Sequence, residues 1–179
     1  MKIAIYGSAV AEESVEKAKQ IGLILAKEGH TIITGGCPGI PYEASRAAED
    51  EGGHTIAYSP AIDLKEHDEK FKFPTEGFTE FKFLSKDFEH TGKKQICLKY
   101  RNILSAVNCD AAIIISGRIG TMNEFTILHE LGKKIGILED SGGITKTAIK
   151  ALLDDANKET KAEVIWEKDP AKLVERITE

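Results

Sequence analysis

The sequence contains few cysteines and no excess of basic residues. The three cysteines, Cys37, Cys97 and Cys109, are odd in number and scattered, so they indicate neither a disulfide framework nor a zinc site. The formal net charge is -5 and the isoelectric point is near 5.6. This charge argues against a nucleic-acid groove, which needs a basic stripe to neutralise phosphates. A small anion held by a local positive field is still compatible with it.

Long apolar runs and a targeting segment are also missing. The longest apolar runs, such as residues 111–115, are far shorter than the ~20 residues that a membrane-spanning helix needs. The N-terminal sequence MKIAIYG reads as a strand and lacks the charged, apolar and small-residue order of a signal peptide. We therefore expect a cytoplasmic protein that does not bind membranes. The histidines also lack metal-ligand spacing, so we expect no metal.

Two familiar nucleotide-binding motifs do not occur. Gly7 alone follows the first predicted strand, where a dinucleotide-binding fold would carry G-x-G-x-x-G. The second strand ends in Thr34-Gly35-Gly36, without an acidic residue to hold a ribose diol, and no Walker lysine pattern is present. These absences argue against NAD-dependent hydride transfer.

Strand and helix signals alternate from end to end, which is typical of a parallel sheet covered by helices on both faces. At 179 residues, 41% hydrophobic and 30% charged, residues 1–179 are predicted to form a single domain. We predict a Rossmann-like, doubly wound α/β fold with a mostly parallel sheet of about six or seven strands. The predicted strands are residues 2–6, 31–34, 54–59, 81–84, 111–115, 135–138 and 162–166. The predicted helices are residues 11–27, 41–51, 94–108, 121–131, 144–158 and 169–177.

Two segments carry further expectations. The helix at 94–108 places one apolar stripe along one face, with Arg101 on its flank; the stripe is Ile96, Tyr100, Ile103, Leu104 and Val107. Residues 60–80 show no clear period, and a segment of this length is often a lid or binding loop. Its lysines and phenylalanines could enclose a base, pack the loop down or contact a second subunit; they are Lys65, Lys70, Lys72, Phe71, Phe73 and Phe78.

Three glycine-containing loops are predicted at the carboxyl edge of the sheet, where ligands bind in such folds. They are YGSA (6–9), TGGCPGIP (34–41) and SGRIGT (116–121). Each alone reads as a tight connection, but three together favour an anion site, because glycine lets consecutive N–H groups converge on a ligand. A helix starting near Thr121 would add about half a positive charge there. The residues expected to contact a phosphate or nucleotide are Gly7, Ser8, Gly35, Gly36, Gly39, Ser116, Gly117, Arg118, Ile119, Gly120 and Thr121.

The segments TGGCPGI, YRN and SGRIGTMNE together resemble the LOG (LONELY GUY) family, often labelled "possible lysine decarboxylase", and the molybdenum cofactor carrier proteins. The similarity covers roughly residues 2–155. LOG enzymes hydrolyse the N-glycosidic bond of a nucleoside 5′-monophosphate, which releases the base and ribose 5-phosphate. Four residues match the family signature P-G-G-x-G-T-x-x-E, and Arg101 matches the arginine of its M-x-x-R-K segment; the four are Gly117, Gly120, Thr121 and Glu124.

The chain also departs from these signatures. Ser116 stands in place of proline, Arg118 in place of the second glycine, Leu98 in place of methionine and Asn102 in place of lysine. The Arg-Asn pair is more similar to the carrier proteins than to the hydrolases. The resemblance implies a homodimer or larger assembly, for which outward-facing Leu128, Leu131 and Tyr100 could supply an interface.

The resemblance implies catalytic roles for Glu124 and Arg101, and both residues have structural alternatives. Thr121-x-x-Glu124 is also a capping box, in which the glutamate bonds the N-cap N–H. As a catalyst, Glu124 would bind the ribose hydroxyls and stabilise positive charge on the anomeric carbon. Arg101 is either a solvated helix residue or a guanidinium that holds the nucleotide or the departing base. Cys37 is interpreted as a small filler, because it has no evident histidine partner.

Two functions remain open. The first is a nucleotide phosphoribohydrolase that requires no cofactor; the acid for its leaving group is unassigned, with Asp63, Asp68 and Glu80 as guesses. The second is a protein that binds or carries a nucleotide, the molybdenum cofactor or a similar phosphorylated ligand without cleaving it. Amino-acid decarboxylation is rejected, because no pyridoxal phosphate lysine site is recognisable.

Overall fold

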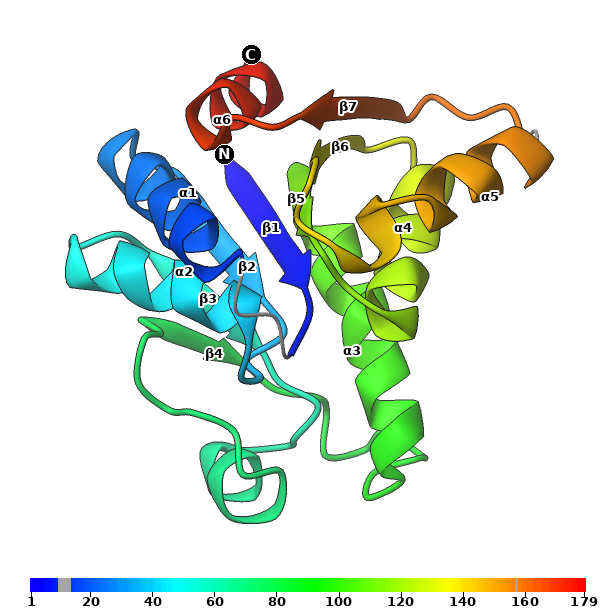
Figure 1. The fold of residues 1–179 in the computed structure, drawn as a ribbon. Coiled ribbons are helices and arrows are strands. Elements are labelled where there is room, and N and C mark those ends of the chain that lie inside the picture. Colours follow the sequence, from blue (N-terminus) through cyan, green and yellow to red (C-terminus); the bar gives the residue numbers. More distant parts are fainter. Residues whose placement is uncertain (10–13, 157) are drawn as a thin grey trace.

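The computed structural model describes residues 1–9, 14–156 and 158–179 of the chain. Within these residues, a 7-stranded parallel sheet has the order β4-β3-β2-β1-β5-β6-β7, with helices on both faces (Figure 1). The strands are β1 (Lys2–Gly7), β2 (Thr31–Thr34), β3 (Thr55–Tyr58), β4 (Glu80–Lys82), β5 (Ala111–Ile115), β6 (Lys134–Leu138) and β7 (Glu163–Glu167). The predicted Rossmann-like fold class is confirmed.

The chain order reverses direction between β1 and β5. Successive strands from β1 to β4 extend the sheet one way, and β5 to β7 extend it the other way. Ile3 of β1 pairs with Ala111 of β5, and Gly7 pairs with Ile115, so both strands end at the same level. The connections after β1 and β5 leave to opposite faces here, which creates the crevice where such folds bind ligands.

The helices form two layers (Figure 1). One layer contains α1 (Val15–Lys27), α2 (Ile40–Asp50) and α6 (Pro170–Thr178). The other contains α3 (Lys94–Asn108), α4 (Ile119–Glu130) and α5 (Ala148–Ala156). The predicted start of α1 near residue 11 lies outside the described residues. None of the helices that the structure describes is both long and apolar enough to cross a membrane.

β5 and α6 show how local sequence sets these elements. All five residues of β5, AAIII, are buried, because the strand lies between two helical layers and needs apolar side chains on both faces. α6 begins at Pro170, and the carboxylate of Asp169 accepts hydrogen bonds from the N–H groups of Ala171 and Lys172. An N-cap aspartate followed by proline is a strong helix start, so this boundary was predicted almost to the residue.

The apolar stripe of α3 faces outward. Four of its members have exposed fractions of 36–51%; they are Ile96, Tyr100, Ile103 and Val107. The buried side of α3 instead carries smaller or polar side chains, namely Cys97, Arg101, Asn102, Ser105 and Ala106. One interface expectation is wrong, because Leu128 is fully buried, whereas Leu131 is exposed.

Residues 60–80 form a packed segment around a buried histidine. His67 lies in a short π-helical turn, Glu66–Lys70, and its Nδ1 is 2.8 Å from Ser59 Oγ while its Nε2 is 3.0 Å from the carbonyl oxygen of Pro74. The rings of Phe73 and Phe81 pack edge-on against the imidazole. Of the three alternatives for this segment, the structure shows its aromatic side chains packing the loop down.

α4 and α5 begin at least two residues away from their predicted starts. α4 begins at Ile119, before the predicted start at Thr121, and Arg118 is its N-cap residue. α5 begins at Ala148 and ends at Ala156, after a 3-10 turn at Gly143–Thr145. The predicted start at residue 144 is wrong, because the 3-10 turn occupies the place of the expected first α-helical turn.

Candidate functional site

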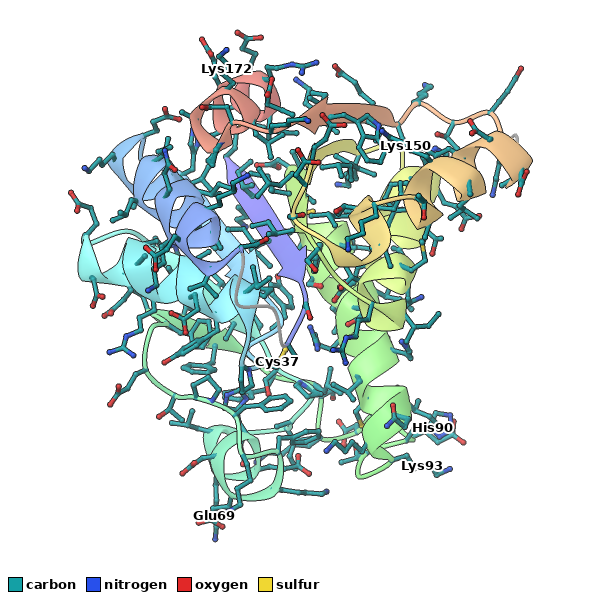
Figure 2. The ribbon with its side chains drawn as sticks, in the orientation of Figure 1. Cys37, Glu69, His90, Lys93, Lys150 and Lys172 are labelled. Carbon is teal, nitrogen blue, oxygen red and sulfur yellow. The ribbon has the colours of Figure 1, made fainter. Side chains whose placement is uncertain are left out.

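A cleft of about 270 Å³ opens at the carboxyl ends of β1 and β2, against the first turns of α3 and α4. Figure 2 shows Cys37, one of its lining residues, on the loop after β2, and Lys93 at the start of α3. The cleft is lined by Ile5, Tyr6, Gly7, Gly35, Cys37, Pro41, Gln95, Leu98, Lys99, Arg101, Asn102, Ile119, Gly120, Thr121 and Glu124. It therefore contains parts of all three predicted glycine loops.

Arg101 and Glu124 meet in this cleft. Arg101 Nη1 lies 3.6 Å from Glu124 Oε1, and the two residues are only 5% and 7% exposed. The separation allows strong electrostatic attraction but is longer than a good hydrogen bond. Neither residue is therefore a solvated helix side chain.

The guanidinium of Arg101 fits against a glycine and retains free donor capacity. A Cβ atom at Gly35 would lie 1.7 Å from Arg101 Nη1 and 2.5 Å from its Cζ, so only glycine leaves room for the guanidinium in this position. Arg101 Nε is buried without a hydrogen-bond partner among the described residues. A buried donor without a partner costs free energy, so this N–H is available to a ligand oxygen.

The environment of Glu124 favours its neutral form. Burial raises the pKa of this carboxyl to about 7, although the positive charges of Arg101 and Lys99 act to lower it. A carboxyl with this pKa exists in both protonation states near neutral pH. Such a group in a cleft is a functional-site candidate on physical grounds.

Asn102 contacts the carboxyl from the same helix as Arg101. In one amide orientation its Nδ2 donates to Asn123 Oδ1 at 3.1 Å; in the other it donates to Glu124 Oε1 at 3.1 Å and to the Leu98 carbonyl at 3.0 Å. We assign the second orientation, because it places the donor between two acceptors. Asn102 thus supplies a neutral hydrogen bond to Glu124, where the LOG signature has a lysine.

The start of α4 supplies backbone donors to the cleft. Because α4 begins at Ile119, the N–H groups of its first residues lack acceptors within the helix. Thr121 does not cap the helix, since its hydroxyl donates to the Gly7 carbonyl at 3.2 Å. The capping-box interpretation of Thr121 and Glu124 is therefore wrong: Glu124 lies in the second turn and faces Arg101.

Six residues expected to contact a ligand do not line the cleft. Gly36 packs near His67, and Gly39 packs against Ser8. These two glycines therefore contact neighbouring loops and not the cleft. Ser116 and Gly117 are buried residues of the turn that precedes α4. Arg118 is exposed and does not fill the cleft.

Sequence reasoning missed several lining residues. Gln95, Leu98, Lys99 and Asn102 have the i, i+3, i+4, i+7 spacing of one helix face, so this second, polar face of α3 could have been found by periodicity. Tyr6 was included only as the first residue of the predicted YGSA loop, without a role of its own. Its hydroxyl donates to Ser105 Oγ at 2.9 Å, and burial raises its pKa well above the ordinary value, so it stays protonated.

The three guessed leaving-group acids lie elsewhere. Asp63 Oδ1 accepts from the Glu66 N–H at 2.8 Å, Glu80 pairs with Lys82 and His54 on the edge strand, and Asp68 is exposed. Among the described residues, Glu124 is the only carboxyl group that lines the cleft. No group of three or more His, Cys, Asp or Glu side chains in the described ranges could hold a metal ion.

A second hollow, of about 230 Å³, lies between α4 and α5. It is lined by Phe125, Thr126, His129, Glu130, Leu152, Leu153, Ala156, Lys158 and Glu159. These residues include neither a glycine loop nor a buried charged pair. The cleft that contains Arg101 and Glu124 is therefore the better candidate site.

Comparison with known proteins agrees with this fold. The family model for the SLOG cluster4 family matches residues 1–174. The structure of TM1055, a structural genomics target, superimposes with a TM-score of 0.79 at 20% identity, covering 99% of this chain and 98% of that one.

Two further solved structures carry functional descriptions. One is a molybdenum cofactor binding protein from the phototrophic bacterium Rippkaea orientalis, with a TM-score of 0.77, 20% identity, and coverage of 99% of this chain and 94% of that one. The other is DNA processing protein A from Helicobacter pylori, described by its single-stranded DNA binding mode, with a TM-score of 0.68, 20% identity, and coverage of 99% and 80%. At these identities the likeness establishes the fold alone.

Proposed function

The chain belongs to the SLOG cluster4 family, within the LOG-like superfamily, and on this basis we propose that it hydrolyses the N-glycosidic bond of a nucleoside 5′-monophosphate. One observation carries the proposal. A buried carboxyl faces a buried guanidinium with an unpaired Nε, beside the first amides of α4, in one cleft. These are the groups needed to hold a phosphate monoester and to stabilise a cationic sugar.

The phosphate monoester would bind at the start of α4. The N–H groups of Ile119, Gly120 and Thr121 and the helix dipole favour an anion there. The exposed Lys99 adds positive charge to the same cleft. A local positive field of this kind suits a small anion even though the whole chain carries a net charge of -5.

The chemistry would proceed through an oxocarbenium-like transition state. The base departs with the electron pair of the C1′–N bond and takes up a proton, while the ionised carboxylate of Glu124 stabilises the positive charge at C1′ and binds the ribose hydroxyls. Water then adds to C1′ and loses a proton, which gives ribose 5-phosphate. Arg101 would orient the nucleotide through its paired donors and keep Glu124 partly ionised.

The Glu124→Gln variant tests the catalytic role. The substitution preserves shape and hydrogen bonding but removes the negative charge, so base release from AMP should fall by at least about 100-fold while AMP still binds. Chromatography of free base and calorimetry of AMP binding measure the two effects. Full activity of the variant would remove Glu124 from the mechanism.

One observation favours a second function, binding without cleavage. Glu124 is the only carboxyl lining the cleft among the described residues, so none of these residues offers a second acid to protonate the departing base. A carrier or sensor of a phosphorylated ligand needs no such acid. Incubation with AMP and other monophosphates separates the two functions, since binding without release of base supports the carrier.

We propose a small ligand rather than a nucleic acid. The cleft of about 270 Å³ is the size of a small molecule, and its basic lining residues are only Lys99 and Arg101 among the described residues. Neutralising several phosphates of a strand requires a longer basic surface. Binding of a single-stranded oligonucleotide that weakens steeply with salt would contradict this.

A further inference from the structure

The turn between β5 and α4 contains a strained residue held by a hydrogen bond. Ser116 has φ of 60°, in the left-handed region that non-glycine residues rarely adopt, and it is 4% exposed. Its N–H donates to Ser141 Oγ at 2.7 Å. Proline, which the LOG signature has at this position, could neither adopt this φ nor donate this bond.

Ser141 is fixed by its own contacts. Its hydroxyl donates to the Leu138 carbonyl at 2.6 Å and lies 3.2 Å from Thr145 Oγ1. Its carbonyl accepts from Ser14 Oγ at 3.0 Å, which connects it to the start of α1. The hydroxyl is therefore a rigid acceptor for the Ser116 N–H.

Further contacts join the same two loops. The Gly117 carbonyl accepts from the Ile144 N–H at 3.1 Å, and a Cβ at Gly143 would lie 2.2 Å from that carbonyl oxygen. Asp140, beside Ser141, has φ of 57°. Strained residues persist only where surrounding contacts hold them, and both loops here are held by each other.

We infer that Ser141 is a positioning residue: its hydroxyl holds the Ser116–Gly117 turn so that the first amides of α4 point into the cleft. The geometry carries this, because only Arg118 separates the turn from Ile119 and Gly120, which line the cleft, whereas Ser116, Gly117 and Ser141 do not line it. The inference rests on the proposed function in one respect, that these amides bind a phosphate monoester.

A double-variant cycle tests the inference with ribose 5-phosphate as the probe. Ser141→Ala removes the acceptor, so the turn relaxes and affinity should fall on the order of 10- to 100-fold. Ser116→Gly alone should change affinity little, because glycine adopts φ of 60° without strain and keeps its N–H. Combining the two should restore most of the affinity, since the turn no longer needs to be held.

Two affinity results would overturn the inference. The first is an affinity of Ser141→Ala for ribose 5-phosphate equal to that of wild type. The second is an equal loss of affinity in Ser141→Ala and in the double variant, because the loss would then not depend on strain at Ser116. Ser141→Thr, which keeps the hydroxyl, should bind like wild type. Ser141→Cys, a weaker acceptor of similar size, replaces the alanine variant if that fails to fold.

A measurement on the free protein separates this inference from the proposed function. In wild type, the Ser116 amide should exchange slowly with deuterium, and in Ser141→Ala it should exchange faster, with amide shift changes at residues 116–120. Unchanged exchange and shifts would overturn the inference. If wild type does not bind ribose 5-phosphate, the phosphate site fails, but these free-protein data still decide the role of Ser141.

Discussion

The guanidinium of Arg101 and the carboxyl of Glu124 come from neighbouring helices and meet in the cleft, with 3.6 Å between Nη1 and Oε1. Burial raises the free energy of the ionised form of Glu124, and the single guanidinium offsets only part of this desolvation cost. The pair therefore adds little to stability as an ion pair, and its buried donor and carboxyl suit a ligand.

The first consequence is a pH-dependent stability. The folded pKa of Glu124, about 7, exceeds its ordinary value of 4.5, so the folded state holds a proton that the unfolded state releases between these values. The contribution of the protonated Glu124 carboxyl to the free energy of unfolding is greatest below pH 4.5 and is lost as the pH rises through about 7. The free energy of unfolding of Glu124→Gln relative to wild type should rise by up to about 3 kcal/mol between pH 4.5 and 8.

Urea denaturation at several pH values measures this difference. Glu175→Gln, at an exposed position of α6 and without an ion pair among the described residues, is the matched control and should show no such trend. A difference between Glu124→Gln and wild type that is constant over this pH range would contradict the raised pKa.

The second consequence concerns the rate of hydrolysis. Only ionised Glu124 can stabilise the cationic sugar, so kcat/KM for AMP should fall about tenfold per pH unit below pH 7. An ordinary glutamate would place this acidic limb near pH 4.5. A profile that is flat from pH 5 to 8 would show that ionisation of Glu124 does not limit the reaction.

The third prediction concerns Gly35. Its alanine variant places Cβ 1.7 Å from Arg101 Nη1, so the guanidinium must move. Affinity for ribose 5-phosphate should drop on the order of tenfold or more, as for a displaced charged donor. In an Arg101→Ala background the same change should have little further effect, and additive losses in this cycle would mean that Gly35 acts independently of Arg101.

The fourth prediction concerns the exposed stripe of α3. Ile96, Tyr100, Ile103 and Val107 repeat every three or four residues on an uncovered face, which is the pattern of a helix that packs on another subunit. Ile103→Lys should reduce self-association in sedimentation experiments, and its thermal stability should no longer rise with protein concentration. Leu64→Lys, at a similarly exposed apolar residue, is the control. A wild-type protein that stays monomeric at high concentration would refute this interface.

Local patterns predicted much of the fold. Residues 111–115 and 94–108 were predicted with the bounds that the structure has, because a buried apolar run and a long amphipathic period are unambiguous. The predicted start of α4 at Thr121 is wrong. The capping-box pattern indicated Thr121, whereas the observed N-cap, Arg118, makes no side-chain cap hydrogen bond and so gives no sequence signal. Periodicity also revealed the stripe of α3 but could not tell whether it faces the core or a partner.

The site was only partly accessible to sequence reasoning. The resemblance singled out Arg101 and Glu124, yet nothing local indicated that Gly35 is shaped around the guanidinium or that Asn102 contacts the carboxyl. Ser141 could not be found at all, because its role depends on a contact with a turn from another strand. Such long-range contacts exist only once the sheet has brought the loops together.

The central claim is that a phosphate monoester binds beside Arg101 and Glu124 at the start of α4. Amide and arginine side-chain NMR during titration with ribose 5-phosphate tests it most directly, because this ligand would bind a hydrolase and a carrier alike. We expect the largest shift changes at Gly35, Ile119, Gly120 and the Nε–H of Arg101. Saturable changes confined to the hollow between α4 and α5, or no changes at millimolar ligand, would contradict the claim.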